Sequence, residues 1–470
     1  MIIRILAALL ALFISAPMMA SAESISAIIA SSGETALKTG VAPGIAIAVV
    51  RNGTIIAAQG FGYANITTKR AVTPDTRFAI GSLTKQFTAA AIMLLVNDGK
   101  LRLDDTLAAY FPALPNAKTI TLQMLLNQTS GLHTYPLLSE HPWPLKGSIA
   151  TSTILSYLAS DHPDFLPGTK WAYSNANYAV LAAIIEKASG ESYGTFLQRH
   201  IFRPLGMAKS GYGFLAQTSA PIAVGYEKGQ AESPALSLDL LSGAGGIVSS
   251  VNDLARWDSA LMGNTLLTKA DRHAMWAAGE LPDGAKIPYA MGWIPTQIAG
   301  HREVWHNGLA PGVGGYCYNA IFPDDNVAIV VLTNGFAAGG IPERIVANVA
   351  ASLGIGQLPS DTKPQSAPGD DPNIDALAQK FWSQLASNTV DSSLLEAKFA
   401  DALTPSLRSE TAQGITIMGP VKSWTFVGKS RLGEGLLAYR YHLIFVSGQT
   451  HDWAIVIDHA GKIAGSRLVQ

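Results

Sequence analysis

The stretch Gly81-Ser82-Leu83-Thr84-Lys85-Gln86-Phe87-Thr88-Ala89-Ala90-Ala91-Ile92-Met93-Leu94-Leu95-Val96 decides the fold of this chain. From Phe87 to Val96 only Thr88 is polar, so a helix here would be apolar on every side, which is typical of a helix buried in a core. Ser82 and Lys85 are three positions apart and would share one face of that helix. The stretch therefore predicts a nucleophilic serine beside a lysine at the start of a buried central helix.

The start of a helix also suits such a serine. Its unpaired backbone N–H groups and partial positive charge stabilise an oxyanion. The pattern Ser-x-x-Lys alone is weak, because a second copy, Ser360-Asp361-Thr362-Lys363, occurs in a Pro-rich stretch where no helix is expected. A helix cap followed by a surface lysine is the alternative interpretation at Ser82, so support must come from the rest of the chain.

Length and composition limit the classes of partner. The chain has 470 residues, of which 48% are apolar, enough for two or three domains with a large core. Charged residues make up 14%, and 33 basic residues stand against 34 acidic ones. With basic and acidic residues in balance, the protein has no net positive charge that would attract nucleic acid or an anionic membrane. The expected partner is a small molecule or a peptide, and the sequence leaves the oligomeric state open.

The first 22 residues, Met1 to Ala22, have the pattern of a secretory signal. Arg4 precedes an apolar run, Ile5 to Ile14, and Ala20-Ser21-Ala22 fits a cleavage site. A retained membrane anchor is the alternative, but the run is shorter than the roughly 20 residues that span a bilayer. We therefore expect a periplasmic or extracellular protein with no membrane anchor after cleavage.

Cys317 is the single cysteine, so the chain has no intramolecular disulfide and must be stable by packing alone. Its apolar surroundings predict a buried strand residue. A position bordering the active site is the alternative.

The order of the predicted elements indicates an α/β (α+β) fold. A helix over 24–39 and two strands, 44–50 and 54–61, joined by Asn52-Gly53, open the chain. The middle is mainly helical, with helices predicted at 121–128, 177–188, 193–202 and 254–262, an irregular stretch at 133–167 and a glycine turn at 243–246. Strands return at 290–294, 304–306, 315–322 and 327–333 before a closing helix at 341–353.

Strands at both ends of a helical middle predict one antiparallel sheet, flanked by helices and carrying a helical insert. We expect this domain to cover residues 23–356. A linker with four prolines follows at 357–373, and residues 374–470 have the pattern of a small α+β accessory domain. That domain resembles cystatin-like or NTF2-like folds at the level of pattern only, and it carries no cluster of residues that would predict a site.

Two further motifs lie where a serine acyl-enzyme would need them. Tyr173-Ser174-Asn175 precedes a predicted helix, and His306-Asn307-Gly308 ends a predicted strand. Two similar patterns have simpler interpretations. Tyr63-Ala64-Asn65 leaves the first hairpin, where a turn asparagine suffices, and Lys38-Thr39-Gly40 ends the first helix.

The three motifs, taken in order and with their spacing, resemble those of the class C β-lactamase and penicillin-binding DD-peptidase superfamily, including its esterase and D-aminopeptidase branches. The supporting segments are also similar; they are Leu125-Leu126-Asn127-Gln128-Thr129-Ser130-Gly131-Leu132, Ala244-Gly245-Gly246-Ile247-Val248-Ser249-Ser250 and Met291-Gly292-Trp293. The resemblance covers residues 23–353 and predicts a serine hydrolase with a β-lactamase/transpeptidase-like fold.

The resemblance implies a role for each motif residue. Ser82 would attack a carbonyl and form an acyl-enzyme, Lys85 would take the serine proton, and Tyr173 would relay it to the leaving group. The substrate would be bound by Asn175, by His306 and Gly308, and by Leu309, whose backbone N–H would form an oxyanion hole with that of Ser82. His306 would touch a substrate carboxylate or the Tyr173 hydroxyl. No cofactor and no metal are implied.

Two departures from the family pattern affect the chemistry. His306 stands where the β-lactamases of this class have lysine, and Gln128 replaces a histidine common in the related branch. For Tyr173 to be a phenolate at neutral pH, its pKa would have to fall by about three units from its ordinary value near 10. A neutral imidazole at His306 would lower that pKa less than the ammonium group of a lysine would. We therefore expect Tyr173 to stay protonated and Lys85 to act as the base. Efficient β-lactam hydrolysis is doubtful, which favours a peptidase or an esterase.

The sequence leaves the acyl substrate open among D-amino-acid peptides, peptidoglycan-derived peptides, β-lactams and small esters. A protein of another class is the competing hypothesis, namely a catalytically idle member that binds peptidoglycan fragments or a protein partner. Such a protein would be expected to have lost Ser82, Lys85 or Tyr173, and all three are present.

Overall fold

A computed structural model of the chain describes most of its residues. The described ranges are 22–135, 147–227, 229–231, 237–263, 265–298, 301–310, 314–336, 338–355, 371–403, 408, 411–412, 415, 419–431, 436–445 and 450–469. All but the last residue of the predicted signal segment, most of the predicted linker and the second Ser-x-x-Lys copy lie outside the described residues.

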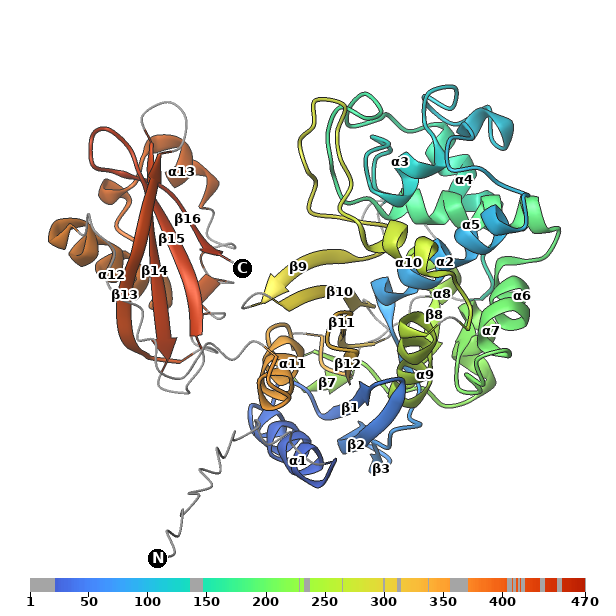
Figure 1. The fold of residues 1–470 in the computed structure, drawn as a ribbon, viewed down its shortest axis with the longest axis horizontal. Helices are drawn as coiled ribbons and strands as arrows, with labels where there is room; N and C mark the ends of the chain where they lie inside the picture. The colour runs from blue at the N-terminus through green and yellow to red at the C-terminus, as the bar shows by residue number, and fades with distance from the viewer. Residues whose placement is uncertain are drawn as a thin grey trace, which may run out of the picture. The chain divides into compact units, whose positions relative to one another are not determined.

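The chain divides into two compact units (Figure 1). The first comprises Met1–Ile294, Val304–Ala338 and Arg344–Ile355, and the second comprises Pro295–Glu303, Gly339–Glu343 and Gly356–Gln470. The three sequence motifs all belong to the first unit, so the candidate site can be described within it alone.

The predicted fold class is confirmed by a seven-stranded sheet in the order β3-β2-β1-β12-β11-β10-β9. Strands from the two ends of the region meet at its centre, where β1 pairs antiparallel with β12 and Ile45 lies opposite Thr333. The bounds of the strands are β1 Gly44–Arg51, β2 Thr54–Asn65, β3 Arg70–Ala71, β9 Ile294–Ile298, β10 His301–Leu309, β11 Tyr316–Phe322 and β12 Val327–Thr333.

The central strands are buried on both faces because helices cover each side. Helix α1 (Ala22–Lys38) packs against β1 and β2, and helix α9 (Val251–Met262) packs against β1 and β12 (Figure 1). The side chains of β1 alternate accordingly. Ala46, Ala48 and Val50 join the main hydrophobic core, and all residues of β1 before Arg51 are buried.

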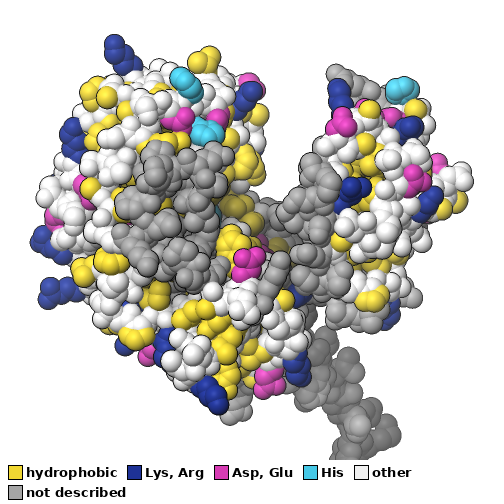
Figure 2. All heavy atoms as spheres, turned by 180° about the vertical axis from the view of Figure 1, so that it is seen from behind, with side chains coloured by type: hydrophobic (Ala, Val, Ile, Leu, Met, Phe, Trp, Pro, Cys, Tyr) yellow, Lys and Arg dark blue, Asp and Glu magenta, His cyan; other side chains and the backbone are white. Residues whose placement is uncertain are grey.

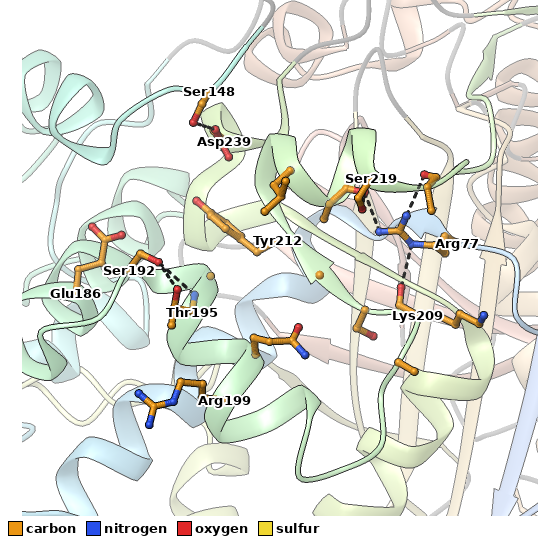
Figure 3. Close-up of a pocket in the computed structure, with 18 residues that line it drawn as sticks. Arg77, Ser148, Glu186, Ser192, Thr195, Arg199, Lys209, Tyr212, Ser219 and Asp239 are labelled. Carbon is orange, nitrogen blue, oxygen red and sulfur yellow. Dashed lines mark hydrogen bonds between the residues drawn. The ribbon is translucent and has the colours of Figure 1, made fainter.

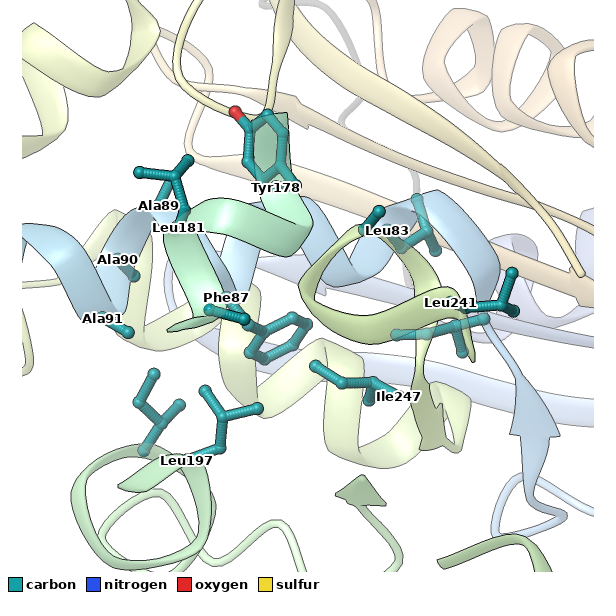
Figure 4. Packing of buried hydrophobic residues seen from close by; sticks show 14 of the residues in the cluster. Leu83, Phe87, Ala89, Ala90, Ala91, Tyr178, Leu181, Leu197, Leu241 and Ile247 are labelled. Carbon is teal, nitrogen blue, oxygen red and sulfur yellow. The ribbon is translucent and has the colours of Figure 1, made fainter. Parts of the chain in front are cut away.

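Helix α2 (Thr84–Asn97) lies at the centre of the helical part, as the apolar run predicts. Figure 4 shows Phe87 and Ala89 to Ala91 surrounded by side chains of neighbouring helices. Phe87 stacks on Trp257 with ring centroids 4.2 Å apart. The helix ends at Asn97, and Gly99 follows it with a positive φ of 69°, the left-handed conformation common after a helix C-terminus. The core therefore holds the start of α2 rigidly in place.

The helices of the middle region mostly follow the prediction. They are α3 Leu122–Leu126, α4 Thr151–Ala159, α5 Asn175–Ser189, α6 Tyr193–Leu197, a π-helical turn η3 Gln198–Phe202, α7 Gly213–Ser219, α8 Leu238–Gly245 and α10 Lys269–Trp276, with short 3-10 turns η1 Gly81–Leu83 and η2 Leu107–Ala109. The predicted closing helix is α11 Ile341–Ser352, after the last strand of the sheet. Short strands β4 Phe78–Ala79, β8 Ile247–Ser249 and β5 Gly211–Tyr212 form a second sheet, and β6 Tyr226–Glu227 pairs with β7 Gln230–Ala231.

Three local predictions are wrong. Helix α4 lies inside the stretch predicted to be irregular, because Ile154 and Leu158 bury one apolar face in the core. The glycines at 243–245 belong to helix α8 rather than to a turn, because the break falls one residue earlier, at Ser242 with φ 46° and ψ −145°. The predicted strand at 290–294 is a loop, and strand β9 begins only at Ile294.

The simpler interpretations of three sequence features hold. Gly40, with φ 70°, follows the end of α1, and Asn65 Oδ1 accepts a hydrogen bond from Thr68 N as a turn asparagine does. Cys317 is fully buried in β11, and burial raises the pKa of its thiol to about 12. Cys317 also pairs with Gly308 of the third motif, so it lies next to the strand that carries the site.

The second unit contains a four-stranded antiparallel sheet in the order β13-β14-β15-β16. Phe381 and Trp382 of helix α12 pack with Trp453 of the sheet in a separate hydrophobic core. The bounds are α12 Pro372–Ala386, η4 Ser392–Leu394, α13 Ala397–Ala402, β13 Val421–Arg431, β14 Leu437–Phe445, β15 Thr450–Ile457 and β16 Ile463–Val469. The linker boundaries and the cystatin-like or NTF2-like character remain predictions.

The surface matches the balanced charge of the sequence. On the face shown in Figure 2, described Lys and Arg side chains lie dispersed among acidic and uncharged ones. Among the helices within the described ranges, none combines the length and the apolar character that crossing a membrane requires.

Asp258 of α9 gives the first testable prediction, because it is a fully buried carboxyl group. Its Oδ1 accepts a hydrogen bond of 2.8 Å from Asn319 Nδ2, and burial raises its pKa to about 8. The folded protein therefore keeps this proton between about pH 4 and 8, where the unfolded chain loses it, so stability should fall as the pH rises through that range. Urea unfolding at pH 5 and pH 8 should show Asp258→Asn to be more stable than wild type at pH 8 by on the order of a few kcal/mol.

The exposed Asp104→Asn variant is the surface control, since Asp104 is paired only with Arg102. An unchanged difference between wild type and Asp258→Asn at the two pH values would contradict the prediction.

Candidate active site

Ser82 lies in the 3-10 turn η1, directly before helix α2 rather than inside it. Gly81 adopts φ 52°, a left-handed conformation that favours glycine. The turn continues into the α-helix, so Ser82 and Lys85 still share one face, and Lys85 Nζ lies 3.1 Å from Ser82 Oγ. The serine and lysine of the first motif are therefore in hydrogen-bond contact.

The Lys85 amine is fully buried and hydrogen-bonds three groups. It lies 3.1 Å from Ser82 Oγ, 2.9 Å from Asn175 Oδ1 and 2.8 Å from the carbonyl oxygen of Ala244. Burial lowers the pKa of Lys85 well below its ordinary value, because charge is costly away from water. A neutral amine beside a serine hydroxyl has a free electron pair and can accept its proton.

Tyr173 approaches Ser82 from the other side. Its hydroxyl donates to Ser82 Oγ over 2.9 Å, and the Lys85 amine lies 4.7 Å from the centre of its ring. The residue as a whole is 39% exposed, but protein atoms surround the phenol. This burial raises its pKa above the ordinary value, and the hydrogen bond to Ser82 offsets only part of the rise. The phenol is therefore protonated at neutral pH and can act as a proton donor.

Asn175 is the first residue of helix α5, and its side chain orients the lysine. Ser174 caps the helix by accepting a hydrogen bond from Ala176 N over 3.2 Å, and Asn175 N donates to Thr134 Oγ1. Asn175 Oδ1 is occupied by Lys85, which leaves its amide Nδ2 as the group that can donate to a substrate carbonyl.

The third motif brings a strand against the serine turn. A Cβ on Gly308 would lie 2.0 Å from Ile80 O, and a Cβ on Gly81 would lie 2.6 Å from Leu309 N. Only glycine permits this approach at both positions. The backbone segments that carry the N–H groups of Ser82 and Leu309 are consequently in contact, as two donors to one oxyanion would require.

His306 lies beside the site and is bound by protein groups on both ring nitrogens. Its Nε2 hydrogen-bonds the Tyr289 hydroxyl at 3.0 Å, its Nδ1 lies 2.5 Å from Asn307 O, and the residue is only 1% exposed. Its ring centre is 6.0 Å from that of Tyr173, so it supports the tyrosine by packing. Both ring nitrogens are engaged within the protein, and the contact with a substrate carboxylate or the Tyr173 hydroxyl stays a prediction.

The charge of His306 gives a second testable prediction. Burial, together with the nearby Lys85, lowers its pKa to about 3. The imidazole should therefore stay neutral from pH 5 to 9, and its NMR resonances, assigned by their loss in His306→Gln, should not shift over that range. A chemical-shift change with a midpoint between pH 5 and 7 would show that His306 takes up a proton in this range and would contradict the prediction.

Three further groups of the site were not predicted. Tyr289 binds His306, Ala244 O binds Lys85, and Thr134 Oγ1 binds Asn175 N. Tyr289 precedes the Met291-Gly292-Trp293 segment, where a Cβ on Gly292 would lie 2.6 Å from Lys85 O. That close approach explains why this segment accompanies the three motifs, but a backbone carbonyl such as Ala244 O has no signature in the sequence.

A cavity of about 780 Å³ lies elsewhere in the first unit (Figure 3). Tyr212, Asp239 and Arg77 line it, and the Arg77 guanidinium donates to three backbone carbonyls, of Lys209, Ala216 and Ala220. None of its lining residues belongs to the serine site, so this cavity is separate from the chemistry. Within the described ranges no three His, Cys, Asp or Glu side chains cluster as metal ligands would.

Comparisons with known proteins agree with the geometry. A family model described as Beta-lactamase matches residues 30–351. A penicillin-binding protein of Bacillus subtilis (strain 168) is 32% identical over 287 residues, which cover 56% of this chain and 63% of that protein. A D-aminopeptidase of Brucella canis is 29% identical over 325 residues, 67% of this chain and 60% of that protein. The chain thus matches less than two thirds of the length of these relatives.

Solved structures show the same fold. A D-amino acid amidase from Ochrobactrum anthropi, complexed with L-phenylalanine amide, has a TM-score of 0.61 at 23% identity and covers 70% of this chain and 99% of its own. An octameric penicillin-binding protein homologue from Pyrococcus abyssi has a TM-score of 0.60 at 22% identity and covers 95% of this chain and 99% of its own. From the fold, the three motifs that the fold brings together and the family match, we conclude that this chain belongs to the Beta-lactamase family.

Proposed function

We propose that the protein is an exported hydrolase that forms an acyl-enzyme at Ser82 on an amide or ester substrate. The observation that carries the proposal is that Ser82 Oγ lies 3.1 Å from a buried amine and 2.9 Å from a phenol. These are hydrogen-bond distances to a candidate base and a candidate acid at the same time.

The steps follow from the positions of the groups. Lys85 takes the proton of Ser82 as Oγ bonds to the substrate carbonyl carbon, and the N–H groups of Ser82 and Leu309 bind the resulting oxyanion. Tyr173 then donates its proton to the leaving amine or alcohol and is reprotonated from Lys85. Water repeats the sequence on the ester to release the acid and restore Ser82.

The environment of His306 bears on the substrate class. A neutral, buried imidazole supplies no positive charge to a substrate carboxylate. We therefore favour D-amino-acid amides and small esters, which carry no carboxylate, over β-lactams. The names of the relatives, a D-aminopeptidase and a D-amino acid amidase, support D-amino-acid amides as the first substrates to test. The apolar stretch at Ile5–Ile14 supports export to the periplasm or beyond.

Intact mass spectrometry after incubation with a fluorophosphonate and with a penicillin tests the proposal, with Ser82→Ala as the control. A fluorophosphonate adduct without a penicillin adduct would support the esterase or amidase class. A long-lived penicillin adduct would support a DD-peptidase, and hydrolysed drug with little adduct would support a β-lactamase. No adduct of either kind would favour the idle binding protein.

A further inference from the structure

Gln128 has an unusual position in the structure. It is fully buried, and its backbone adopts φ 67°, a left-handed conformation that is uncommon for a residue other than glycine. It follows the short helix α3 and begins the segment Gln128 to Gly131. A strained, buried polar residue in this place needs contacts that hold it there.

Those contacts lie on both sides of Tyr173. The backbone oxygen of Gln128 accepts a hydrogen bond from Ala172 N over 3.1 Å. Its side-chain Oε1 accepts one from Ser174 N over 3.0 Å and another from Asn177 Nδ2 over 2.6 Å. Gln128 therefore binds the residue before Tyr173, the residue after it and the first turn of helix α5.

The neighbouring residues extend this attachment. Thr129 O accepts from Gly168 N over 2.8 Å, and Ser130 Oγ donates to Asn177 Oδ1. The segment after α3 thus runs along the loop that leads to the second motif. Within it, Gln128 is the residue whose side chain reaches the motif backbone itself.

We propose that Gln128 is a positioning residue that fixes the Tyr173 hydroxyl and the Asn175 amide against Ser82 and Lys85. The inference rests on the proposed function of the serine site. A single acceptor atom, Gln128 Oε1, binds both the backbone of the second motif and Asn177 of α5, so losing it loosens Tyr173 and Asn175 together while both side chains remain chemically intact. Small displacements of such groups can cost about 100-fold in rate.

Two substitutions of Gln128 distinguish the effect of its side-chain length from the effect of its backbone conformation. Gln128→Asn keeps the amide and suits a left-handed backbone, but it is one methylene too short to reach Ser174 N and Asn177 Nδ2. Gln128→Glu keeps the length and the acceptor oxygen. In hydrolysis of D-phenylalanine amide by the full chain, where the leaving amine needs a proton, Gln128→Asn should lower kcat by about 10- to 100-fold with KM changed by less than about threefold, and Gln128→Glu should stay within about fivefold of wild type.

A double-mutant cycle of Gln128→Asn and Tyr173→Phe distinguishes positioning of Tyr173 from a general structural role. Because part of the Gln128 effect passes through the Tyr173 hydroxyl, adding Gln128→Asn to Tyr173→Phe should lower kcat by clearly less than the 10- to 100-fold loss that Gln128→Asn causes in the wild-type background. Losses that multiply, or a Gln128→Glu variant as impaired as Gln128→Asn, would overturn the inference. So would a folded Gln128→Asn with the wild-type kcat.

If Gln128→Asn does not fold, Gln128→Met is the second variant. It keeps nearly the same side-chain volume and removes the acceptor atom Oε1. Its kcat is expected to fall by the same 10- to 100-fold, and a wild-type kcat would overturn the inference. Failure of the proposed function has a different signature, because wild type itself would then show no turnover that depends on Ser82.

Discussion

Replacing Lys85 with methionine is expected to lower kcat/KM by about 10²- to 10⁴-fold, the usual contribution of general acid–base catalysis. The variant removes the amine that lies 3.1 Å from Ser82 Oγ and keeps nearly the same volume in a fully buried position. Measuring kcat/KM from pH 5 to 10 on an ester and an amide checks the result. Wild-type activity should rise with pH as Lys85 loses its proton, at a pH well below the ordinary lysine pKa.

Stability separates a chemical effect from a structural one. Because burial lowers the pKa of Lys85, the folded protein binds this proton less readily than the unfolded chain, and that difference destabilises the fold at neutral pH. The Lys85→Met variant should therefore unfold at the same temperature as wild type or higher. Lys187→Met is the matched control, since Lys187 also donates to a carbonyl, that of Tyr110, but on the surface. An active Lys85→Met variant with a flat pH profile above neutrality would rule out Lys85 as the base.

Replacing Tyr173 with phenylalanine should lower kcat on an amide by about 10²- to 10³-fold with little change in KM, because the proton donor for the leaving amine is lost. The phenol carries its proton at neutral pH, since burial raises its pKa, and it lies 2.9 Å from Ser82 Oγ. The loss should be smaller on a p-nitrophenyl ester, whose leaving group departs as an anion without a proton. Comparing D-phenylalanine amide with p-nitrophenyl acetate checks this.

Tyr110→Phe is the control for that comparison, because it removes a partly buried hydroxyl that binds Asp105 away from the site. Equal losses on both substrates would show that Tyr173 positions the substrate rather than donating a proton.

The sequence predicts most of the fold because each of its strong signals has one physical cause. An apolar run on every side of a helix requires burial, as α2 shows, and Asn52-Gly53 with positive φ at both residues closes the β1–β2 hairpin. The failures occur where tertiary packing decides. Helix α4 has only two buried residues, Ile154 and Leu158, and the break in α8 falls at Ser242 rather than at its glycines.

The contacts of the candidate site could also be predicted only in part, because several of them depend on tertiary packing. The spacing of Ser82 and Lys85 predicts their contact, and Tyr173 joins them as the resemblance implies. The hydrogen bonds of His306 could not be predicted, because its partner Tyr289 lies 17 residues away on another segment. Gln128 was noticed only as a departure from the family pattern, since its contacts depend on a left-handed backbone that the sequence does not reveal.

The most direct test of the account is to treat the full chain with a fluorophosphonate, weigh it intact and map the modified peptide. The account predicts one adduct, on Ser82, that Ser82→Ala abolishes and that Lys85→Met slows by at least about 100-fold while Lys187→Met does not. An adduct on a different residue, or equal labelling of the Ser82→Ala protein, would contradict the claim that Ser82 is the nucleophile of this hydrolase.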